Sequence, residues 1–176
     1  MPEDDWTPIS EEWLSREDRA CHAGRIERLK WLAVQTPSSE YLTFPGGLMS
    51  KYLFEETRYC FVYGQYLAAI LLGVAFVERT LAVEFYASGR DDLERASLSE
   101  LLREARDAGW LNTEEYEALH RARQIRNPVT HFRRPGYEDT VEYRMIKDNE
   151  LAYSIIEQDA RTVVSVALHI LERNAI

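Results

Sequence analysis

Apolar residues recur at helical spacing along most of the chain, and turn-forming residues separate the segments in which they do so. The longest segment runs from Leu48 to Ala87, and small residues fill much of its second face. This pattern predicts a helix that is buried either in the core or against another chain. Gly64 leaves two alternatives open, which are two helices or one helix bent at that residue. The apolar positions at i, i+3, i+4 and i+7 spacing are Leu67, Ile70, Leu71, Val74, Val77 and Leu81.

Cap and turn residues define the other predicted helices. Ser97 and Glu100 form a capping box, and Asn112 is a second N-cap residue. Gly109 ends the helix between these two caps because glycine tolerates a positive φ. The predicted helices span about 11–34, 98–108, 113 into the arginine-rich segment that follows, and 153–173. Residues 137–149 alternate weakly and predict an irregular loop or a short hairpin.

Together these segments predict an all-α fold. The main body, residues 47–176, is expected to be an up-and-down bundle of four to five helices, preceded by an N-terminal helical arm, residues 1–46. Turn residues at 36–39 and 44–47 separate the arm from the body. Residues 1–10 are expected to be a loose lead-in, with Gly24 as an interruption of the arm helix. The apolar positions of the arm helix are Trp13, Leu14, Ile26, Leu29 and Leu32.

Composition limits the classes of protein to which the chain can belong. Its 176 residues fit a single domain, and its net charge of −9 argues against nonspecific nucleic-acid binding over the whole surface. The acidic start is unlike a secretory signal, and the apolar run 67–77 is too short to span a bilayer. A cytoplasmic protein without a membrane role is therefore expected. Cys21 and Cys60 are too few for a disulfide framework or a zinc site and are expected to be buried free thiols.

One segment of this acidic chain is strongly basic. No Asp or Glu lies between Ala118 and Tyr137. Such a segment is either a solvated helix face or a site for an anion, and the residues alone leave both interpretations open. Its positive charges are Arg121, Arg123, Arg126, Arg133 and Arg134.

Within this segment, residues 126–131 read Arg-Asn-Pro-Val-Thr-His. They pair a permanent cation with an imidazole that titrates near neutral pH, and this pairing suits chemistry on a phosphate. Pro128 costs a helix interior about 3 kcal/mol or more, so the helix either kinks or restarts at Asn127. On a straight helix, Arg126 and His131 point roughly 140° apart, so a bend or restart is needed to bring them to one cleft. The other interpretation is a tolerated proline between an exposed arginine and an exposed histidine.

The segment resembles the signature of HEPN domains (higher eukaryotes and prokaryotes nucleotide-binding), in which four to six residues separate an Arg from a His and a polar residue often follows the Arg. The surrounding order is also similar. A long apolar helix carrying Gly64–Ala69 and Glu78-Arg79 comes first, then a helix with a Leu-Leu pair, then the motif late in another helix. The resemblance covers about residues 48–173 and leaves the N-terminal arm unaccounted for.

The resemblance implies a dimeric, metal-independent endoribonuclease with one composite site formed by the motifs of two chains, and a role as a toxin or in phage defence. Arg126, Asn127 and His131 would be catalytic, and no metal or cofactor is expected. The expected partners are RNA, a second copy of the chain and an antitoxin or other protein. The alternative is a noncatalytic module that binds a nucleotide or a protein. The side chains expected to guide the RNA backbone are Arg121, Arg123, Arg133 and Arg134.

Four other polar residues are weaker candidates. His120 lies near the motif but is better explained as a partly buried structural histidine. His22 adjoins Cys21 without enough ligands for a metal site, and His169 is expected on the solvent side of the last helix. Glu78 is expected to pair with Arg79 or Arg126 within the bundle.

Overall fold

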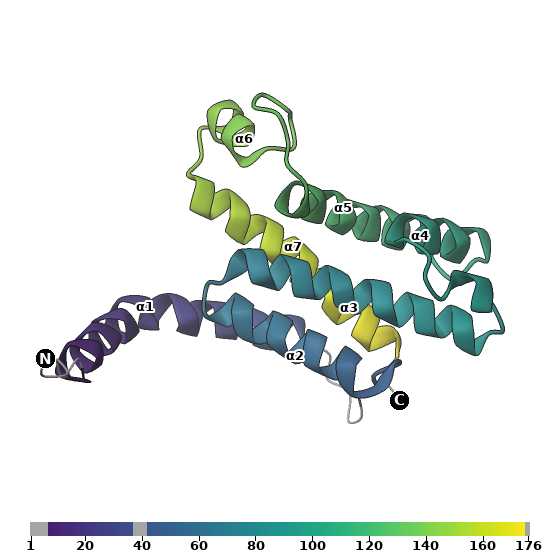
Figure 1. Ribbon diagram of the computed structural model, residues 1–176, viewed down its shortest axis with the longest axis horizontal. Helices are drawn as coiled ribbons and strands as arrows, with labels where there is room; N and C mark the ends of the chain where they lie inside the picture. The colour runs from purple at the N-terminus through teal and green to yellow at the C-terminus, as the bar shows by residue number, and fades with distance from the viewer. Residues whose placement is uncertain (1–6, 37–41, 175–176) are drawn as a thin grey trace, which may run out of the picture.

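The computed structural model describes residues 7–36 and 42–174, and this part of the chain is all-α (Figure 1). It contains seven α-helices and one short 3-10 helix. The predicted all-α class is therefore confirmed, but the body after residue 46 has six α-helices where four to five are predicted. The elements are α1 Thr7–Gln35, α2 Gly47–Val62, α3 Tyr66–Ala87, η1 Asp91–Leu93, α4 Leu98–Asp107, α5 Thr113–Thr130, α6 Val141–Asp148 and α7 Ala152–Arg173.

The long apolar stretch is two helices, so the first of the two alternatives holds. α2 and α3 are joined by a tight turn at Gly64, which has a φ of +77°. Most side chains avoid this left-handed region, and a Cβ atom at Gly64 would also lie 2.8 Å from the Tyr153 hydroxyl. Glycine is therefore required here by both backbone conformation and space.

α3 is the central helix of the bundle and packs against α2, α5 and α7 (Figure 1). Ten of its 22 residues are buried, including Phe76 and Phe85. Gly73 allows α7 to approach closely, since a Cβ atom there would lie 2.7 Å from a Val163 methyl group. The prediction of a buried helix holds for this face, but Leu67 and Leu71 are 50% and 37% exposed.

α3 is also longer than the apolar run that the sequence suggests. Judged by length and composition alone, it is the one helix in the described residues that could cross a membrane. Half of its most apolar window is nevertheless buried inside the bundle, as expected for a core helix.

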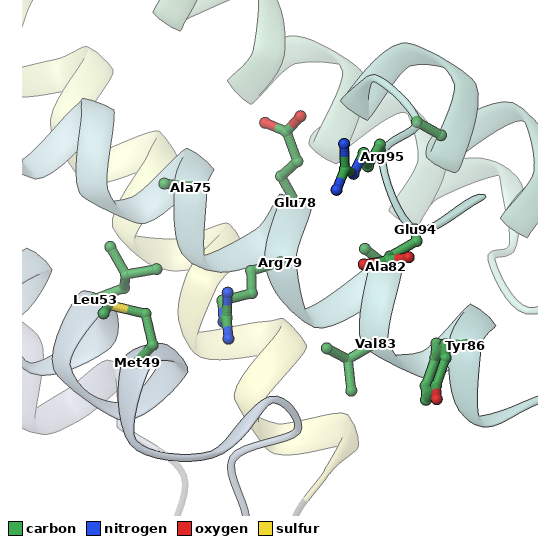
Figure 2. Close-up of a pocket in the computed structure, with 11 residues that line it drawn as sticks. Met49, Leu53, Ala75, Glu78, Arg79, Ala82, Val83, Tyr86, Glu94 and Arg95 are labelled. Carbon is green, nitrogen blue, oxygen red and sulfur yellow. The ribbon is translucent and has the colours of Figure 1, made fainter. Parts of the chain in front are cut away.

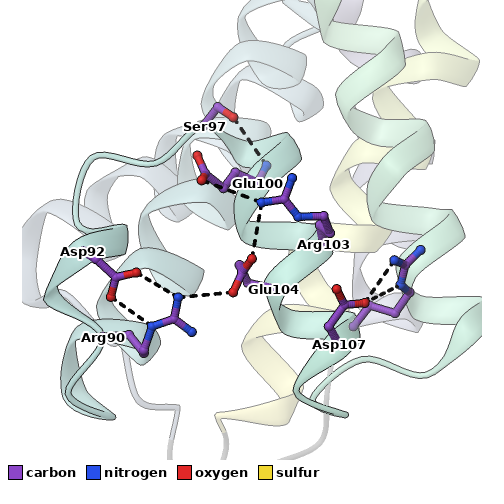
Figure 3. A network of polar contacts seen from close by, with 8 residues as sticks. Arg90, Asp92, Ser97, Glu100, Arg103, Glu104 and Asp107 are labelled. Carbon is purple, nitrogen blue, oxygen red and sulfur yellow. Dashed lines mark hydrogen bonds and ion pairs between the residues drawn. The ribbon is translucent and has the colours of Figure 1, made fainter.

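α4 is a short helix whose polar face is held by charged pairs (Figure 3). The Ser97 side chain accepts a hydrogen bond from the Glu100 backbone N–H at 3.3 Å, which confirms that side of the predicted cap. Arg90 donates to Asp92 at 2.8 and 2.9 Å and to Glu104 at 3.2 Å. The Arg90 guanidinium lowers the pKa of Asp92 and ties η1 to α4.

α1 begins at Thr7 and continues through Gly24, so neither the lead-in predicted for residues 7–10 nor the interruption at Gly24 is present. The remaining lead-in, residues 1–6, and most of the predicted turn at 36–39 lie outside the described residues. The C-terminal half packs on the bundle: Leu32 is 1% exposed, and Arg28 Nε donates to the Val62 carbonyl at 2.9 Å. Cys21 on this helix is exposed, contrary to prediction, whereas Cys60 is buried.

Residues 141–148 form α6, so the predicted loop or hairpin is wrong. The Thr140 hydroxyl caps the helix by accepting from the Tyr143 N–H at 3.3 Å. Arg144 then donates to both carboxylate oxygens of Asp159 on α7, at 2.6 and 3.0 Å. A helix of about two turns is too short for its period to be distinguished from weak alternation, and the anchoring contact is distant in sequence.

Candidate functional site

The candidate motif lies at the C-terminal end of α5, which is a well-defined helix (Figure 1). Its start is fixed by a complete capping box between Asn112 and Glu115, with bonds of 2.8 and 2.9 Å. Leu119 and Ala122 are buried and hold one face of α5 on the bundle. Of the arginines of α5, Arg121 is exposed, whereas Arg123 and Arg126 are partly buried.

Pro128 lies inside α5, and the restart predicted as one alternative at Asn127 is wrong. The helix continues to Thr130, although a proline at 128 cannot donate to the carbonyl of Gln124. The last turn is completed by the His131 N–H, which donates to the Asn127 carbonyl at 2.9 Å. Because only this final turn follows the proline, the helix tolerates one missing hydrogen bond.

Arg126 faces α3, where its guanidinium lies 3.9 Å from the Glu78 carboxylate. The side chains of Arg126 and Glu78 are 24% and 37% exposed. The predicted pairing of Glu78 within the bundle is therefore confirmed, with Arg126 as its partner. An ion pair this long and this exposed contributes little to stability, so a phosphate could displace the carboxylate.

His131 is exposed and marks the end of α5, with an extended backbone at φ −127° and ψ 130°. No hydrogen bond or ion pair in the described part of the chain joins His131 to Arg126. Five positions along this helix correspond to a rotation of roughly 140° between them. A single chain therefore presents a cation and an imidazole from neighbouring turns without bringing them into contact.

Asn127 lines a cavity of about 440 Å³ together with Arg123, Gln124, Glu138 and Asp139. This cavity faces the loop that follows α5 and holds both a guanidinium and two carboxylates. Asn127 therefore lies at a polar surface different from that at which Arg126 meets Glu78.

The other arginines of the basic segment differ in whether they contact other side chains. Arg133 Nε donates to Asp139 at 2.9 Å, and Arg123 donates to the His120 imidazole at 3.0 Å. Arg121 and Arg134 are exposed. Acidic residues from outside the segment thus neutralise part of its charge. The predicted cationic surface is therefore smaller and consists of the exposed arginines.

His120 has a structural environment, as predicted. It is partly buried, and its ring stacks on Tyr116 at a centroid distance of 5.9 Å. An arginine can only donate, so the ring nitrogen that faces Arg123 accepts this hydrogen bond. His120 is therefore occupied by contacts within α5.

One polar cluster next to the motif is not predicted from the sequence. Arg144 and Asp159 line a cavity of about 290 Å³ with Arg121 and Pro128, between α5, α6 and α7. Asp159 is 7% exposed, and its hydrogen bond raises the pKa of Arg144. No motif or spacing marks this pair, because its members come from separate helices.

The remaining candidates behave as structural residues. His169 is on the solvent side of α7, as predicted, and its Nε2 lies 2.9 Å from Glu115. The hydrogen bond with His169 lowers the pKa of Glu115. His22 is exposed on α1. Within residues 7–36 and 42–174, no three His, Cys, Asp or Glu side chains are grouped as metal ligands would be.

Comparisons of the chain with protein-family models, with curated proteins and with solved structures give no match. The candidate site is therefore interpreted from its own geometry and chemistry.

Proposed function

We propose that the chain is a metal-independent endoribonuclease of the HEPN type that acts as a homodimer, with helices α2–α7 as an HEPN-like up-and-down bundle. The observation that supports it is the arrangement at the end of α5. A half-buried Arg126 and an exposed His131 lie on either side of Pro128, within the last turns of one helix. A toxin or a component of phage defence in the cytoplasm is the corresponding biological role.

The proposed reaction uses groups that these side chains can supply. The 2′-hydroxyl of RNA loses its proton to a neutral imidazole and attacks the adjacent phosphorus. A second, protonated imidazole gives its proton to the departing 5′-oxygen. The Arg126 guanidinium stabilises the charge that develops on the phosphate oxygens. The products are a 2′,3′-cyclic phosphate and a 5′-hydroxyl, and acid, base and cation are all side chains.

A dimer supplies the two imidazoles that this route requires, one from each chain. The surface next to His131 fits such a contact, since Phe132 directly follows it and is 88% exposed. In a two-fold pair the same patch meets itself, so both motifs lie at one interface. Asn127 would position the phosphate or the guanidinium. Arg121, Arg123, Arg133 and Arg134 would guide the RNA strand, with the exposed Arg121 and Arg134 the most accessible.

The test is cleavage of a panel of RNA oligonucleotides in the presence of EDTA. Arg126→Ala and His131→Ala should each lower the rate by roughly 10²-fold or more, because each removes a group that acts in the transition state. Arg19→Ala and His22→Ala are matched controls on exposed positions of α1 and should cleave like the parent chain. Equal cleavage by all variants would overturn the proposal.

A noncatalytic module that binds a nucleotide or a protein is the second candidate. It is favoured by the engagement of Arg126 with Glu78 and by the lack of a described contact between Arg126 and His131. Under this alternative, the purified chain cleaves no RNA in the panel but still binds one nucleotide or one protein tightly. Isothermal titration with nucleotides alongside the cleavage assay separates the two functions.

A further inference from the structure

One cavity of the bundle lies beside the candidate motif and is lined by charges of both signs (Figure 2). Its volume is about 770 Å³, and it lies against α2, α3 and residues 94–96, which follow η1. Two guanidiniums and two carboxylates balance, so the lining attracts neither anions nor cations as a class. The cavity still bears on the candidate site, because one of its carboxylates is the partner of Arg126. Its charged side chains are Glu78, Arg79, Glu94 and Arg95.

Only one of these four side chains forms an ion pair within residues 7–36 and 42–174. That pair is the contact of Glu78 with Arg126, at 3.9 Å. Arg95 is exposed, and in the same part of the chain it forms neither an ion pair nor a side-chain hydrogen bond. An unpaired guanidinium therefore lines the same cavity as the carboxylate that restrains Arg126.

The backbone holds Arg95 at the edge of this cavity. Leu93 is 3% exposed and anchors η1 in the core, and the Ala96 N–H donates to the Leu93 carbonyl at 3.1 Å. In Figure 2 the ends of the Arg95 and Glu78 side chains project to the same side of α3. Arg95 is therefore fixed in sequence and in space beside the path that Glu78 takes toward α5.

The other two charges of the cavity are directed elsewhere. Arg79 projects to a different side of α3 and donates to the Gly46 carbonyl, in the turn before α2, at 3.4 Å (Figure 2). The Glu94 carboxylate lies beside Ala82 in the same view, further along α3 than Glu78 (Figure 2). Of the two guanidiniums in the cavity, Arg95 is thus the one placed to receive Glu78.

We propose that Arg95 is a positioning residue of the ribonuclease site, which pairs with Glu78 when a phosphate of RNA displaces this carboxylate from Arg126. This inference rests on the proposed function. The phosphate then occupies Arg126 and the carboxylate occupies Arg95, so the exchange leaves neither charge without a partner. Rotation of the Glu78 side chain, which is 37% exposed, is sufficient for the transfer. Arg95 thereby offsets part of the cost of freeing Arg126 for RNA.

The first test needs no RNA. Arg126→Ala removes the first partner of Glu78, as a bound phosphate would. In this background, Arg95→Gln and Glu78→Gln should be coupled in urea denaturation. The coupling should change the unfolding equilibrium constant by up to about fivefold, the range of an exposed ion pair. With Arg126 present, the same two substitutions should be additive, because Glu78 stays on Arg126.

Arg79→Gln is the matched control for this cycle. It makes the same substitution in the same cavity, next to Glu78 in sequence, but adjacent residues of a helix do not face each other. Its effect should add to that of Glu78→Gln both with and without Arg126. Additive effects of Arg95→Gln and Glu78→Gln in the Arg126→Ala background would overturn the proposal.

The second test measures affinity by fluorescence anisotropy for an RNA that lacks the attacking 2′-hydroxyl. Arg95→Gln should raise the dissociation constant by up to about fivefold, and Arg95→Lys, which keeps the charge, should restore most of the affinity. In a Glu78→Gln background, Arg95→Gln should have no effect, because no carboxylate remains to be transferred. A loss of affinity that persists there would mean that Arg95 contacts the RNA directly, and the proposed transfer would be wrong.

The two tests distinguish a failure of this inference from a failure of the proposed function. RNA cleavage by a chain in which Arg95 and Glu78 show no coupling leaves the ribonuclease intact and removes the role of Arg95. A parent chain that neither binds nor cleaves RNA removes the ribonuclease and the role of Arg95 in it, even where the coupling in Arg126→Ala is present.

Discussion

At the scale of single residues, the decisive contact is between Arg126 and Glu78, because the cation that we propose to bind phosphate is held by a carboxylate of the same chain. The distance of 3.9 Å and the partial exposure of both side chains indicate a weak ion pair. Under the proposed function, RNA binding would have to replace this contact. The carboxylate therefore sets how readily Arg126 becomes available.

Glu78→Gln should increase RNA affinity. Removing an exposed ion pair worth about 0.2–1 kcal/mol should lower the dissociation constant by up to about fivefold. The measurement is fluorescence anisotropy with an RNA whose 2′-hydroxyl at the cleavage position is replaced by hydrogen. Glu94→Gln is the control, since Glu94 and Glu78 line one cavity of about 770 Å³ and, within the described residues, only Glu78 forms an ion pair with Arg126. Weaker binding by Glu78→Gln would mean that the carboxylate helps to position Arg126 rather than to restrain it.

Pro128 is the second residue whose substitution separates stability from function. Alanine restores an N–H for the Gln124 carbonyl and removes the ring from the helix interior, where proline costs about 3 kcal/mol. Loss of the proline's restriction on the unfolded chain offsets up to about 1 kcal/mol. Pro128→Ala should therefore raise the free energy of unfolding by about 1–2 kcal/mol in urea denaturation.

The same substitution should lower cleavage if the proline sets the direction of His131. Pro135→Ala, in the exposed turn after the motif, is the control. It should change the free energy of unfolding by no more than about 1 kcal/mol and the cleavage rate by no more than a small factor. A Pro128→Ala chain that is both less stable and fully active would show that the proline serves packing alone.

At the scale of elements, the contact between α3 and α7 depends on the absence of a side chain at Gly73. An added Cβ would lie 2.7 Å from Val163 Cγ1 and 3.2 Å from Thr57 Cγ2. Alanine favours a helix by about 1 kcal/mol over glycine, but overpacking of a core costs about 1–3 kcal/mol. Gly73→Ala should therefore lower the free energy of unfolding by up to about 2 kcal/mol.

A double-mutant cycle tests the cause of that loss. Val163→Ala makes room for the new methyl group, so the double variant should be more stable than the sum of the two single effects predicts. Chemical denaturation of all four chains gives the coupling energy. Additive effects would place the strain of Gly73→Ala elsewhere than at Val163.

The elements that sequence patterns predict correctly are those fixed by local signals. The caps at Ser97 and Asn112 act on backbone groups three residues away, and the apolar face of α7 repeats over six turns. α6 is missed because its anchor, Arg144 on Asp159, spans 15 positions. The exposure of Trp13 on α1 likewise depends on where the chain places the bundle, and no local spacing encodes it.

The candidate site is predictable only in part for the same reason. The hexapeptide and its proline are visible in the sequence, and the pairing of Glu78 with an arginine is expected from composition. The neutralisation of Arg133 by Asp139 is not, because the two lie on either side of a turn that folds the acidic residue back. The continuous course of α5 through Pro128 follows from packing on the core, which outweighs the local cost of proline.

At the scale of the whole molecule, the net charge and the exposed apolar surface both favour the proposed dimer. A chain with a net charge of −9 repels nucleic acid unless its few free cations are gathered together. Arg121 is exposed at the middle of α5 and Arg134 just beyond its end, and the proposed two-fold pair would place two such sets around one site. The proposed dimer would thus double the imidazoles and also concentrate positive charge.

Activity should accordingly depend on chain concentration. Where most chains are monomers, the rate of a composite dimer site rises with the square of the concentration, and it becomes linear once dimers dominate. Phe132→Asp places a charge in the proposed contact beside His131 and should shift this change to concentrations about tenfold higher or more. Val34→Asp, at an 81% exposed position on α1, is the matched control. A rate that stays proportional to the chain concentration down to nanomolar concentrations would place the whole reaction within one subunit.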